Sequence, residues 1–537
     1  MSVRDRKLLI LWLAIVPVVL ALGKVVLLMA SGITLTPDEA QYWDWSRRAG
    51  ELSFYTKGPG VAQAIGAATS ILGHEAWAVR LPAVLSGLVL VITVAITSYR
   101  LKASARVASA AVLATLAIPA YWVTSVVMTI DGPYLACWAI AGLLALEVNR
   151  RWSEGRGAPL LSIALGWALG YGFLFKYTIL LMLPGLVIYL LYRFVIRRAG
   201  GRVRVGDVLL AIIAFGYMIS DVIIWNQMHA WPTVSHLLGH LGVAGGDLAV
   251  DAGHDRGGGK AYSPLWTLEF LGLQFVTIGP MVLVIALAIA RRIRKSRFEW
   301  DDLLLLALGA PVLIFYLGVT IFTSGEANWP IAGYITLVPL AAREVAVAMR
   351  SIRARRVRWI ANGKATREGI LRRSPESPIQ IAWHWSLGFG SATMVGLTLI
   401  AIIGATNSVS LLPDSAMVRR ASGSPEVVAA VERARDESPN AFIIANRYQT
   451  AATLAYELRD QPVVSCASAW LGDRATSYDY FEDTRLDREP LAGAMVILVG
   501  SDAAAWRETF DLDLTILDEA AQVYRASQFP DLERRVP

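Results

Sequence analysis

Stretches of about twenty apolar residues recur along most of this chain, and they decide what kind of fold it can adopt. The first covers residues 8–30, which as a helix at about 1.5 Å per residue spans roughly 34 Å, enough to cross a bilayer with some tilt. Further candidates lie near residues 78–98, 105–125, 131–149, 158–175, 177–195, 207–225, 264–290, 302–322, 328–348 and 383–405. The sequence therefore predicts an α-helical polytopic membrane protein with about eleven transmembrane helices.

The composition agrees with this class. Hydrophobic residues make up 55% of the chain and charged residues only 17%, and the mean hydropathy is +0.49, unlike a soluble globular protein. A cleaved signal peptide would have a shorter apolar region, so the first span is expected to remain as an anchor. The Gly- and Ala-rich stretch 61–72 is too short to span and suits a helix at the membrane interface.

Basic residues predict the orientation. They precede the first span and then occupy every second loop, up to a strongly basic segment at residues 343–373. The positive-inside rule makes these loops and the N-terminus cytoplasmic. The net charge of +7 therefore reflects topology and contact with anionic membrane lipids, not nucleic acid. The sequence has no GxxxxGK[ST] motif and no GxGxxG between a strand and a helix, which disfavours an ATP-driven transporter.

After the last span the composition becomes that of a soluble domain. Residues 1–406 are expected to form the transmembrane domain, and residues 407–537 a small α/β domain on the extracytoplasmic side. Helices are predicted in PEVVAAVERARDESP, YQTAATLAYEL and SDAAAWRETF, and strands in NAFIIAN, QPVVS and AMVILVG. The two cysteines, Cys137 and Cys466, lie in different domains, so no disulfide is expected.

Asp38 and Glu39 lie side by side in TPDEAQYWDW, just beyond the first span. Two explanations fit them, and both can hold. Thr36 as N-cap and Pro37 at the first helical position would start a helix with acids in its first turn. A capped helix is also a rigid way to present a carboxylate to a membrane-embedded substrate. The pair is therefore a candidate for catalysis.

Lys57, in SFYTKGPG, follows the acids in the same non-cytoplasmic loop. A carboxylate that removes a proton from an acceptor hydroxyl, with a cation for an anionic leaving group, suits transfer from a lipid-linked phosphate. The alternative for Lys57 is a lysine that extends its charge to the membrane interface.

Several blocks, in order over roughly residues 1–350, resemble bacterial glycosyltransferases of families 39 and 83. They are PDEAQYWDWSRR, LSFYTKGPGVAQAI, AWAVRLPAVLSG, VVMTIDGPYLACWAIA, GFLFKYTILLMLPGL, IWNQMHAWPTVSHLLGH and EANWPIAGYITLVPLA. These enzymes are similar to protein O-mannosyltransferases and to the lipid A aminoarabinose transferase, and have the GT-C fold. The resemblance implies an enzyme of a bacterial cytoplasmic (inner) membrane that takes a polyprenyl-phosphate-linked sugar as donor.

The same resemblance implies roles for individual residues. Asp38 is the candidate catalytic carboxylate with Glu39 beside it, and Lys57 corresponds to the lysine of the family's KPP motif, expected near the lipid phosphate. Here the motif is KGP, so Gly58 predicts a more flexible loop. Gln41 stands where the aminoarabinose enzymes tend to have Arg, which argues against that substrate, and Tyr42 is a candidate substrate-binding residue.

Four more positions match family blocks, each with a plainer alternative. Asp131, in TIDGPY, corresponds to a second catalytic acid or caps the next helix. Lys176 contacts the donor phosphate or extends to the interface. Asn328 and Trp329, in ANWP, bind substrate or start a helix with an aromatic anchor.

The histidines give no metal motif. His236 and His240 share a helical face, but no carboxylate follows as in HExxH, so solvated loop histidines are expected. The sequence indicates no cofactor, and a divalent metal is neither required nor excluded.

Two functions from different classes remain. One is a glycosyltransferase that moves a sugar to an extracytoplasmic glycolipid, lipopolysaccharide, wall polymer or protein. The other is a lipid-linked saccharide transporter or flippase. A transporter tends to place ionisable groups near the midplane and to have repeated halves, whereas the acids here cluster at one face, which favours the enzyme.

Overall fold

The computed structural model describes residues 3–48, 50–240, 246–247, 263–296, 298–322, 325–361, 377–405 and 425–533. The chain divides into two compact units. Unit 1 comprises Met1–Leu27, Leu81–Ile219 and Tyr262–Ala401, and unit 2 comprises Leu28–Arg80, Ser220–Ala261 and Ile402–Pro537. The expected domain boundary near residue 406 lies outside the described residues, and it stays a prediction.

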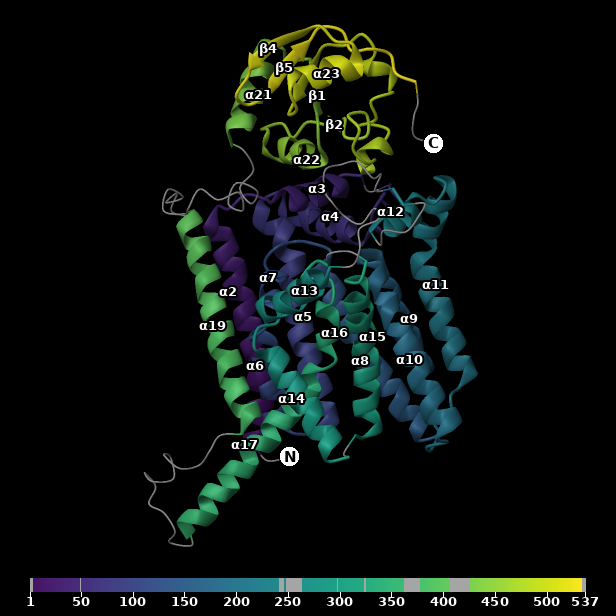
Figure 1. The fold of residues 1–537 in the computed structure, drawn as a ribbon, viewed down its shortest axis with the longest axis vertical. Coiled ribbons are helices and arrows are strands. Elements are labelled where there is room, and N and C mark those ends of the chain that lie inside the picture. Colours follow the sequence, from purple (N-terminus) through teal and green to yellow (C-terminus); the bar gives the residue numbers. More distant parts are fainter. Residues whose placement is uncertain are drawn as a thin grey trace. The chain divides into compact units, whose positions relative to one another are not determined.

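Unit 1 is a bundle of helices (Figure 1). Four of its helices, α2, α5, α11 and α19, extend across the boundary with unit 2. The elements are α1 (Val3–Ile10), η1 (Leu11–Ile15), α2 (Val16–Ser31), α5 (Ala76–Lys102), α6 (Ala105–Leu116), α7 (Pro119–Val123), α8 (Asp131–Ser153), α9 (Pro159–Phe175), η2 (Tyr177–Leu181), α10 (Met182–Leu190), η3 (Leu191–Ile196), α11 (Val205–Met228), α13 (Pro264–Thr277), α14 (Met281–Arg294), α15 (Trp300–Val319), α16 (Ile331–Ile335), α17 (Val338–Ala361) and α19 (Pro378–Ala405).

The predicted membrane class is confirmed, but the count of eleven spans is not. Within the described residues seven helices are long and apolar enough to cross a membrane, or eight if α13 and α14 together make one span. Two of the expected spans are short helices, α6 with 12 residues and α9 with 17. Apolar length alone does not reveal where a helix stops inside a bundle.

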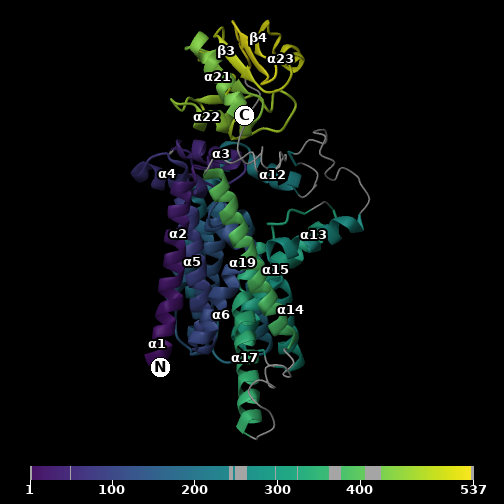
Figure 2. The same cartoon turned by 90° about the vertical axis from the view of Figure 1, so that its left-hand side faces the viewer.

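The pair α13 and α14 is bent by 100°, and Figure 2 shows α13 turning away from the axis of α14. Gly279 lies at the break with a φ of 70°, a left-handed conformation that glycine adopts without steric cost. Pro280 follows and has no backbone N–H to continue the helical hydrogen bonds. A Gly-Pro step therefore interrupts an apolar stretch that was expected to be continuous.

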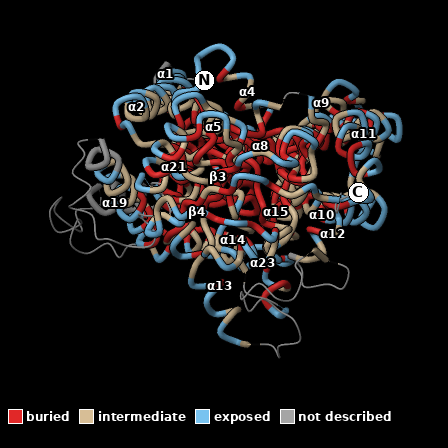
Figure 3. Tube along the Cα trace, turned by 90° about the horizontal axis from the view of Figure 1, so that it is seen from above, coloured by how far each residue is buried: buried red, intermediate tan, exposed pale blue. Residues whose placement is uncertain are grey.

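Burial identifies the centre of unit 1. The most apolar window of α8 is 78% buried and that of Ile331–Ser351 is 94% buried, against 6% for Asp5–Ser31 and 17% for α11. Helix α8 packs on α9, α15 and α16, and Figure 3 colours much of α8 and α15 as buried. The residues that begin α8 and α16 are therefore held by the best-packed part of this unit.

Unit 2 contains short helices and a sheet. Its elements are α3 (Pro37–Ser46), α4 (Gly60–Leu72), α12 (Pro232–His240), α21 (Pro425–Glu437), β1 (Phe442–Ala445), α22 (Tyr448–Glu457), β2 (Val464–Cys466), η5 (Ser477–Asp479), η6 (Glu489–Leu491), β3 (Val496–Val499), α23 (Ala503–Phe510), β4 (Leu514–Asp518) and β5 (Val523–Ala526). Helix α4 covers the stretch expected at the interface. Helix α3 packs on both α4 and α22.

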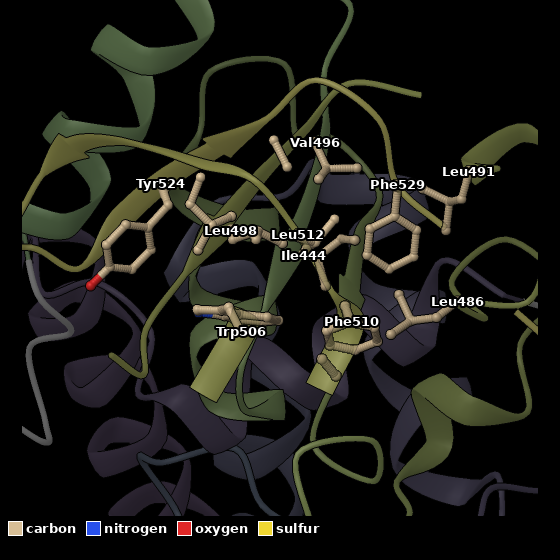
Figure 4. Close-up of a cluster of buried hydrophobic side chains, with 13 residues drawn as sticks. Ile444, Leu486, Leu491, Val496, Leu498, Trp506, Phe510, Leu512, Tyr524 and Phe529 are labelled. Atoms are coloured by element: carbon tan, nitrogen blue, oxygen red, sulfur yellow. The ribbon is translucent and has the colours of Figure 1, made fainter. Parts of the chain in front are cut away.

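The sheet confirms the predicted α/β domain. Its strand order is β2-β1-β3-β5-β4, with β1 parallel to β2 and β3, and β5 antiparallel to β3 and β4. All three predicted helices and all three predicted strands are present. The sequence reading missed β4 and β5, because β4 is half exposed and lacks a continuous apolar run. In Figure 4, Trp506 and Phe510 of α23 pack toward Ile444 and Leu498 of the sheet.

Candidate active site

The start of α3 has the predicted cap. The side chain of Thr36 accepts a hydrogen bond from the Glu39 backbone N–H at 3.3 Å, and the Glu39 carboxylate accepts one from the Thr36 N–H at 3.0 Å. Pro37 occupies the first turn. This reciprocal pair is a capping box, and it uses Glu39 but not Asp38. The cap therefore holds Asp38 in a fixed place on the first turn.

Glu39 is fully buried and bound to Arg80. The guanidinium donates from Nε to Oε1 and from Nη2 to Oε2, both at 2.8 Å, and also donates to the carbonyls of Ile33 and Thr34 at 2.9 and 2.7 Å. A bidentate pair of this kind is strong and directional. Glu39 thus joins α3 to the start of α5. The sequence reading missed Arg80, whose one signal was a cation at the beginning of an apolar helix.

Asp38 faces a cavity of about 160 Å³, roughly five times the ~30 Å³ share of one liquid water. Three separate segments of unit 2 line this cavity, and they bring together the predicted residues Asp38, Tyr42 and Lys57. The full lining is Asp38, Gln41, Tyr42, Thr56, Lys57, His236, Tyr448, Arg474, Ala475, Thr476 and Ser477. Its size suits one small polar group.

The cavity changes the acidity of Asp38. Burial raises the pKa of its carboxyl above the ordinary value, the negative charge of Glu39 raises it further, and Lys57 opposes both. Burial has this effect because it disfavours the charged form. A carboxylate with a raised pKa is a stronger base, and a base works best when its pKa approaches the working pH.

The loop that carries Lys57 is anchored, although it has Gly58 where the family motif has proline. The Lys57 carbonyl accepts hydrogen bonds from the Phe54 N–H at 3.0 Å and from the Ser53 hydroxyl at 3.2 Å. The Phe54 ring stacks on Trp45 of α3 with ring centres 4.4 Å apart. Lys57 is therefore tied to α3 by backbone and aromatic contacts.

The expectation that the histidines are solvated is wrong for His236. Its side chain is 2% exposed, and its Nδ1 lies 2.9 Å from Oδ2 of Asp247. The hydroxyl of Tyr55 donates to the same oxygen. Burial lowers the pKa of His236 and the Asp247 carboxylate opposes this shift. The side chain of His240 lies outside the described residues.

Arg474 and Tyr448 also line the cavity, and the sequence reading missed both. They come from the C-terminal domain, more than 390 residues beyond Lys57 in the chain. Burial raises the pKa of Tyr448 above its ordinary value, the negative charge of Asp38 raises it further, and the positive charge of Arg474 opposes both. No local pattern marks such residues, because their role depends on how the domain folds against α3.

In unit 1, three predicted residues meet in one cluster. The Lys176 ammonium lies 2.8 Å from Oδ1 of Asp131, and the Asn328 amide donates to Oδ2 of Asp131 at 3.0 Å. Asp131 is buried at the start of α8, Lys176 is the largely buried C-cap of α9, and Asn328 is exposed in the turn before α16. Asp131 does not cap α8, because Ile130 is the N-cap and makes no side-chain bond.

Aromatic residues surround this cluster. The Lys176 ammonium lies 5.6 Å from the centre of the Tyr134 ring, within the range of a cation–π contact. Trp329 packs on Tyr316 with ring centres 5.2 Å apart. Trp329 follows Asn328 in the chain, and its ring contacts Tyr316. The Asp131 carboxylate and the Tyr134 ring both contact the Lys176 ammonium. These contacts disfavour the alternative that Lys176 only extends its charge to the membrane interface.

Among the described residues, no three His, Cys, Asp or Glu side chains form a group that could hold a metal ion. The carboxylates of Asp38 and Asp131 lie in different units. Each unit places a carboxylate near a lysine: Asp38 and Lys57 line one cavity, and Asp131 lies 2.8 Å from Lys176.

Comparison with known proteins adds independent findings. Residues 56–225 match the family described as dolichyl-phosphate-mannose-protein mannosyltransferase. The chain is 27% identical over 318 residues to the lipid A galacturonosyltransferase RgtD of Rhizobium johnstonii; this match covers 58% of the chain and 61% of the relative. The chain thus spans less than two thirds of that relative's length.

Solved structures share the fold. The structure of ArnT from Cupriavidus metallidurans bound to undecaprenyl phosphate superposes with a TM-score of 0.59 at 15% identity, covering 95% of this chain and 97% of ArnT. The Archaeoglobus fulgidus oligosaccharyltransferase in the apo form gives a TM-score of 0.51 at 13% identity, covering 92% and 70%. The fold expected from the sequence blocks is confirmed: this multi-pass membrane protein shares the GT-C fold of ArnT.

Proposed function

We propose that this protein is a membrane glycosyltransferase that transfers a sugar from a polyprenyl-phosphate-linked donor to an acceptor outside the cytoplasm. The observation that carries the proposal is one cavity in unit 2 whose lining contains the carboxylate of Asp38 together with Lys57. The GT-C fold, a relative named for galacturonosyl transfer to lipid A and a fold neighbour that binds undecaprenyl phosphate support it. Among glycolipid, lipopolysaccharide, wall polymer and protein acceptors, the relative favours a glycolipid.

The chemistry follows from the cavity. Asp38 accepts the proton of the acceptor hydroxyl, and the freed oxygen bonds to the anomeric carbon of the donor sugar. The bond from that carbon to the phosphate oxygen breaks, and the polyprenyl phosphate leaves with the electron pair. Lys57 stabilises the charge that grows on the phosphate. Tyr42 lies in the same lining and contacts the substrate.

The other predicted residues take separate roles. Glu39, bound to Arg80, positions α3 and Asp38 rather than touching substrate. Asp131, proposed as a second catalytic acid, is held by Lys176 and Asn328, and this preorganised group binds a polar part of the substrate, with Trp329 supplying an apolar wall. The protein resides in a bacterial inner membrane with its N-terminus cytoplasmic and its C-terminal domain outside.

The test uses purified protein, undecaprenyl-phosphate-linked sugars and glycolipid acceptors, with products identified by mass. Asp38→Asn keeps the shape and removes the base, so transfer should fall on the order of a hundredfold or more. Lys57→Ala should weaken donor binding and slow transfer, and Lys57→Arg should retain part of the function because it keeps the charge. The control is Asp473→Asn, an exposed carboxylate near Arg474 but outside the cavity lining.

The pH dependence gives a second readout. Transfer needs the ionised form of Asp38, whose pKa is raised. The rate should therefore fall as the pH drops through this raised pKa, starting at a higher pH than an ordinary carboxylate would give. Normal transfer by Asp38→Asn would remove the catalytic assignment. Donor that crosses the membrane without any transfer would point instead to a transporter.

A further inference from the structure

A second cavity, of about 360 Å³, lies within unit 1 and has no part in the proposed transfer. Three elements surround it: the C-terminal ends of α5 and α14, and one face of α17, with the residues just before α15. Its lining is unusually cationic for a site between membrane helices. It consists of Lys102, Arg291, Arg292, Lys295, Phe298, Glu299, Arg343, Glu344 and Val347.

Buried ion pairs form the inner wall of this cavity. Asp302, fully buried at the start of α15, binds both Arg292 and Arg343, and Arg292 also donates to Glu344 at 3.1 Å. Glu299 lies 3.9 Å from Arg343. Five cationic side chains thus meet three carboxylates here, and positive charge is left over.

The buried arginines retain unused hydrogen-bond donors. The Arg343 side chain is 2% exposed, yet its Nε and Nη1 have no hydrogen-bond partner among the described residues, and neither has Nε of Arg292. An unsatisfied buried donor is costly, more so on a charged group, and such groups in a native structure need an explanation. Donors that line an electropositive cavity are explained by an anionic ligand that accepts from them.

The position of the cavity identifies the kind of anion. Helices α5 and α13–α14 are apolar stretches of membrane-spanning length that end at Lys102 and Arg294, so the cavity opens where apolar helices reach the membrane surface. Lys102 and Lys295 are exposed at its rim. Beside them Ile293 is 63% exposed. An apolar surface next to a cationic cavity matches a molecule with an acyl chain and a phosphate.

We propose that this cavity binds the phosphate of an anionic phospholipid. The lipid belongs to the leaflet at whose surface α5 and α14 end, and its acyl chains lie along α14. The buried guanidiniums of Arg292 and Arg343 donate hydrogen bonds to the phosphate oxygens, and Lys102 and Lys295 close over the phosphate from the rim. Bound lipid would tie the ends of α5, α14 and α17 together.

The test measures lipid binding to the full-length protein in detergent by native mass spectrometry. Dioleoylphosphatidylglycerol should bind more tightly than dioleoylphosphatidylcholine. Lys102→Ala and Lys295→Ala should each weaken phosphatidylglycerol binding about fivefold, because the attraction between one basic residue and anionic lipid changes the affinity by about that factor. The double variant should bind more weakly than either single variant. These rim lysines are exposed, so the variants should fold. Arg294→Ala is the matched control: it is an exposed cation on the same helix end, outside the lining.

Three results decide the proposal. Loss of phosphatidylglycerol binding in the double variant, with normal binding by Arg294→Ala, supports it. Equal binding by the wild type and the double variant overturns it. Inorganic phosphate that displaces the lipid from the wild type at equal concentration overturns the assignment to a lipid, because the acyl chains would then contribute nothing.

Discussion

Two adjacent carboxylates in α3 have opposite surroundings. Glu39 is buried against Arg80 and closes the capping box, whereas Asp38 lines a polar cavity and has a raised pKa. Successive residues on a helix point about a hundred degrees apart, so neighbours in sequence need not share a task. One carboxylate stabilises the site and the other is left available for chemistry.

The pair of Glu39 and Arg80 gives a prediction about stability. Arg80→Ala would leave a fully buried carboxylate without its partner, which costs about 3–5 kcal/mol. The melting temperature of the purified protein should drop sharply. Arg433→Ala is the control, because its pair with Asp518 is 65% exposed on the arginine side, and exposed pairs contribute at most about 1 kcal/mol. Similar melting temperatures for the two variants would contradict this account of Glu39.

At the scale of elements, close helix approach in unit 1 depends on particular glycines. A Cβ built on Gly185 of α10 would lie 1.7 Å from the Ala307 carbonyl oxygen of α15, a backbone atom that cannot move aside alone. Small residues at such contacts let helix backbones pack closely in membranes. Gly216 of α11 has nothing within 4 Å of its Cβ position.

This contrast predicts opposite effects of the same substitution. Gly185→Ala must push α10 and α15 apart and should destabilise the protein by about 1–3 kcal/mol. Gly216→Ala meets open space and gains helix propensity, so its stability should be unchanged or up to about 1 kcal/mol higher. Thermal unfolding of both variants in one detergent compares them directly. A Gly185→Ala protein as stable as the wild type would show that α10 and α15 do not pack at this position.

For the whole molecule, the distribution of basic residues predicts the orientation. With the N-terminus cytoplasmic and the C-terminal domain outside, a reporter that is active only in the cytoplasm should be silent when fused after Pro537. The same reporter fused within the basic segment at residues 362–376 should be active, because that segment is expected on the cytoplasmic side. An active C-terminal fusion would place Asp38 and the sheet domain on the wrong side for an extracytoplasmic acceptor.

Local sequence determined the elements of this protein. Long apolar stretches specify helices of membrane-spanning length, Thr36, Pro37 and Glu39 specify the start of α3, and short apolar runs specify β1, β2 and β3. These features depend on a few neighbouring residues, so they can be read from a window of the sequence. The Gly-Pro step at residues 279–280 is equally local, yet its effect was missed because hydropathy alone was weighed.

Tertiary packing decided which polar groups meet. Asp131 binds Lys176 from 45 residues away and Asn328 from 197 residues away, and the cavity at Asp38 is completed by His236 and Arg474 from two other segments. A buried charge is stable only when it is paired with another group. The sequence does not identify the partner residue, because the packing of the helices determines which groups come into contact. The same reason explains why Arg292 and Arg343, which were counted with the basic residues of cytoplasmic loops, and Arg80, which was missed, are buried parts of the architecture.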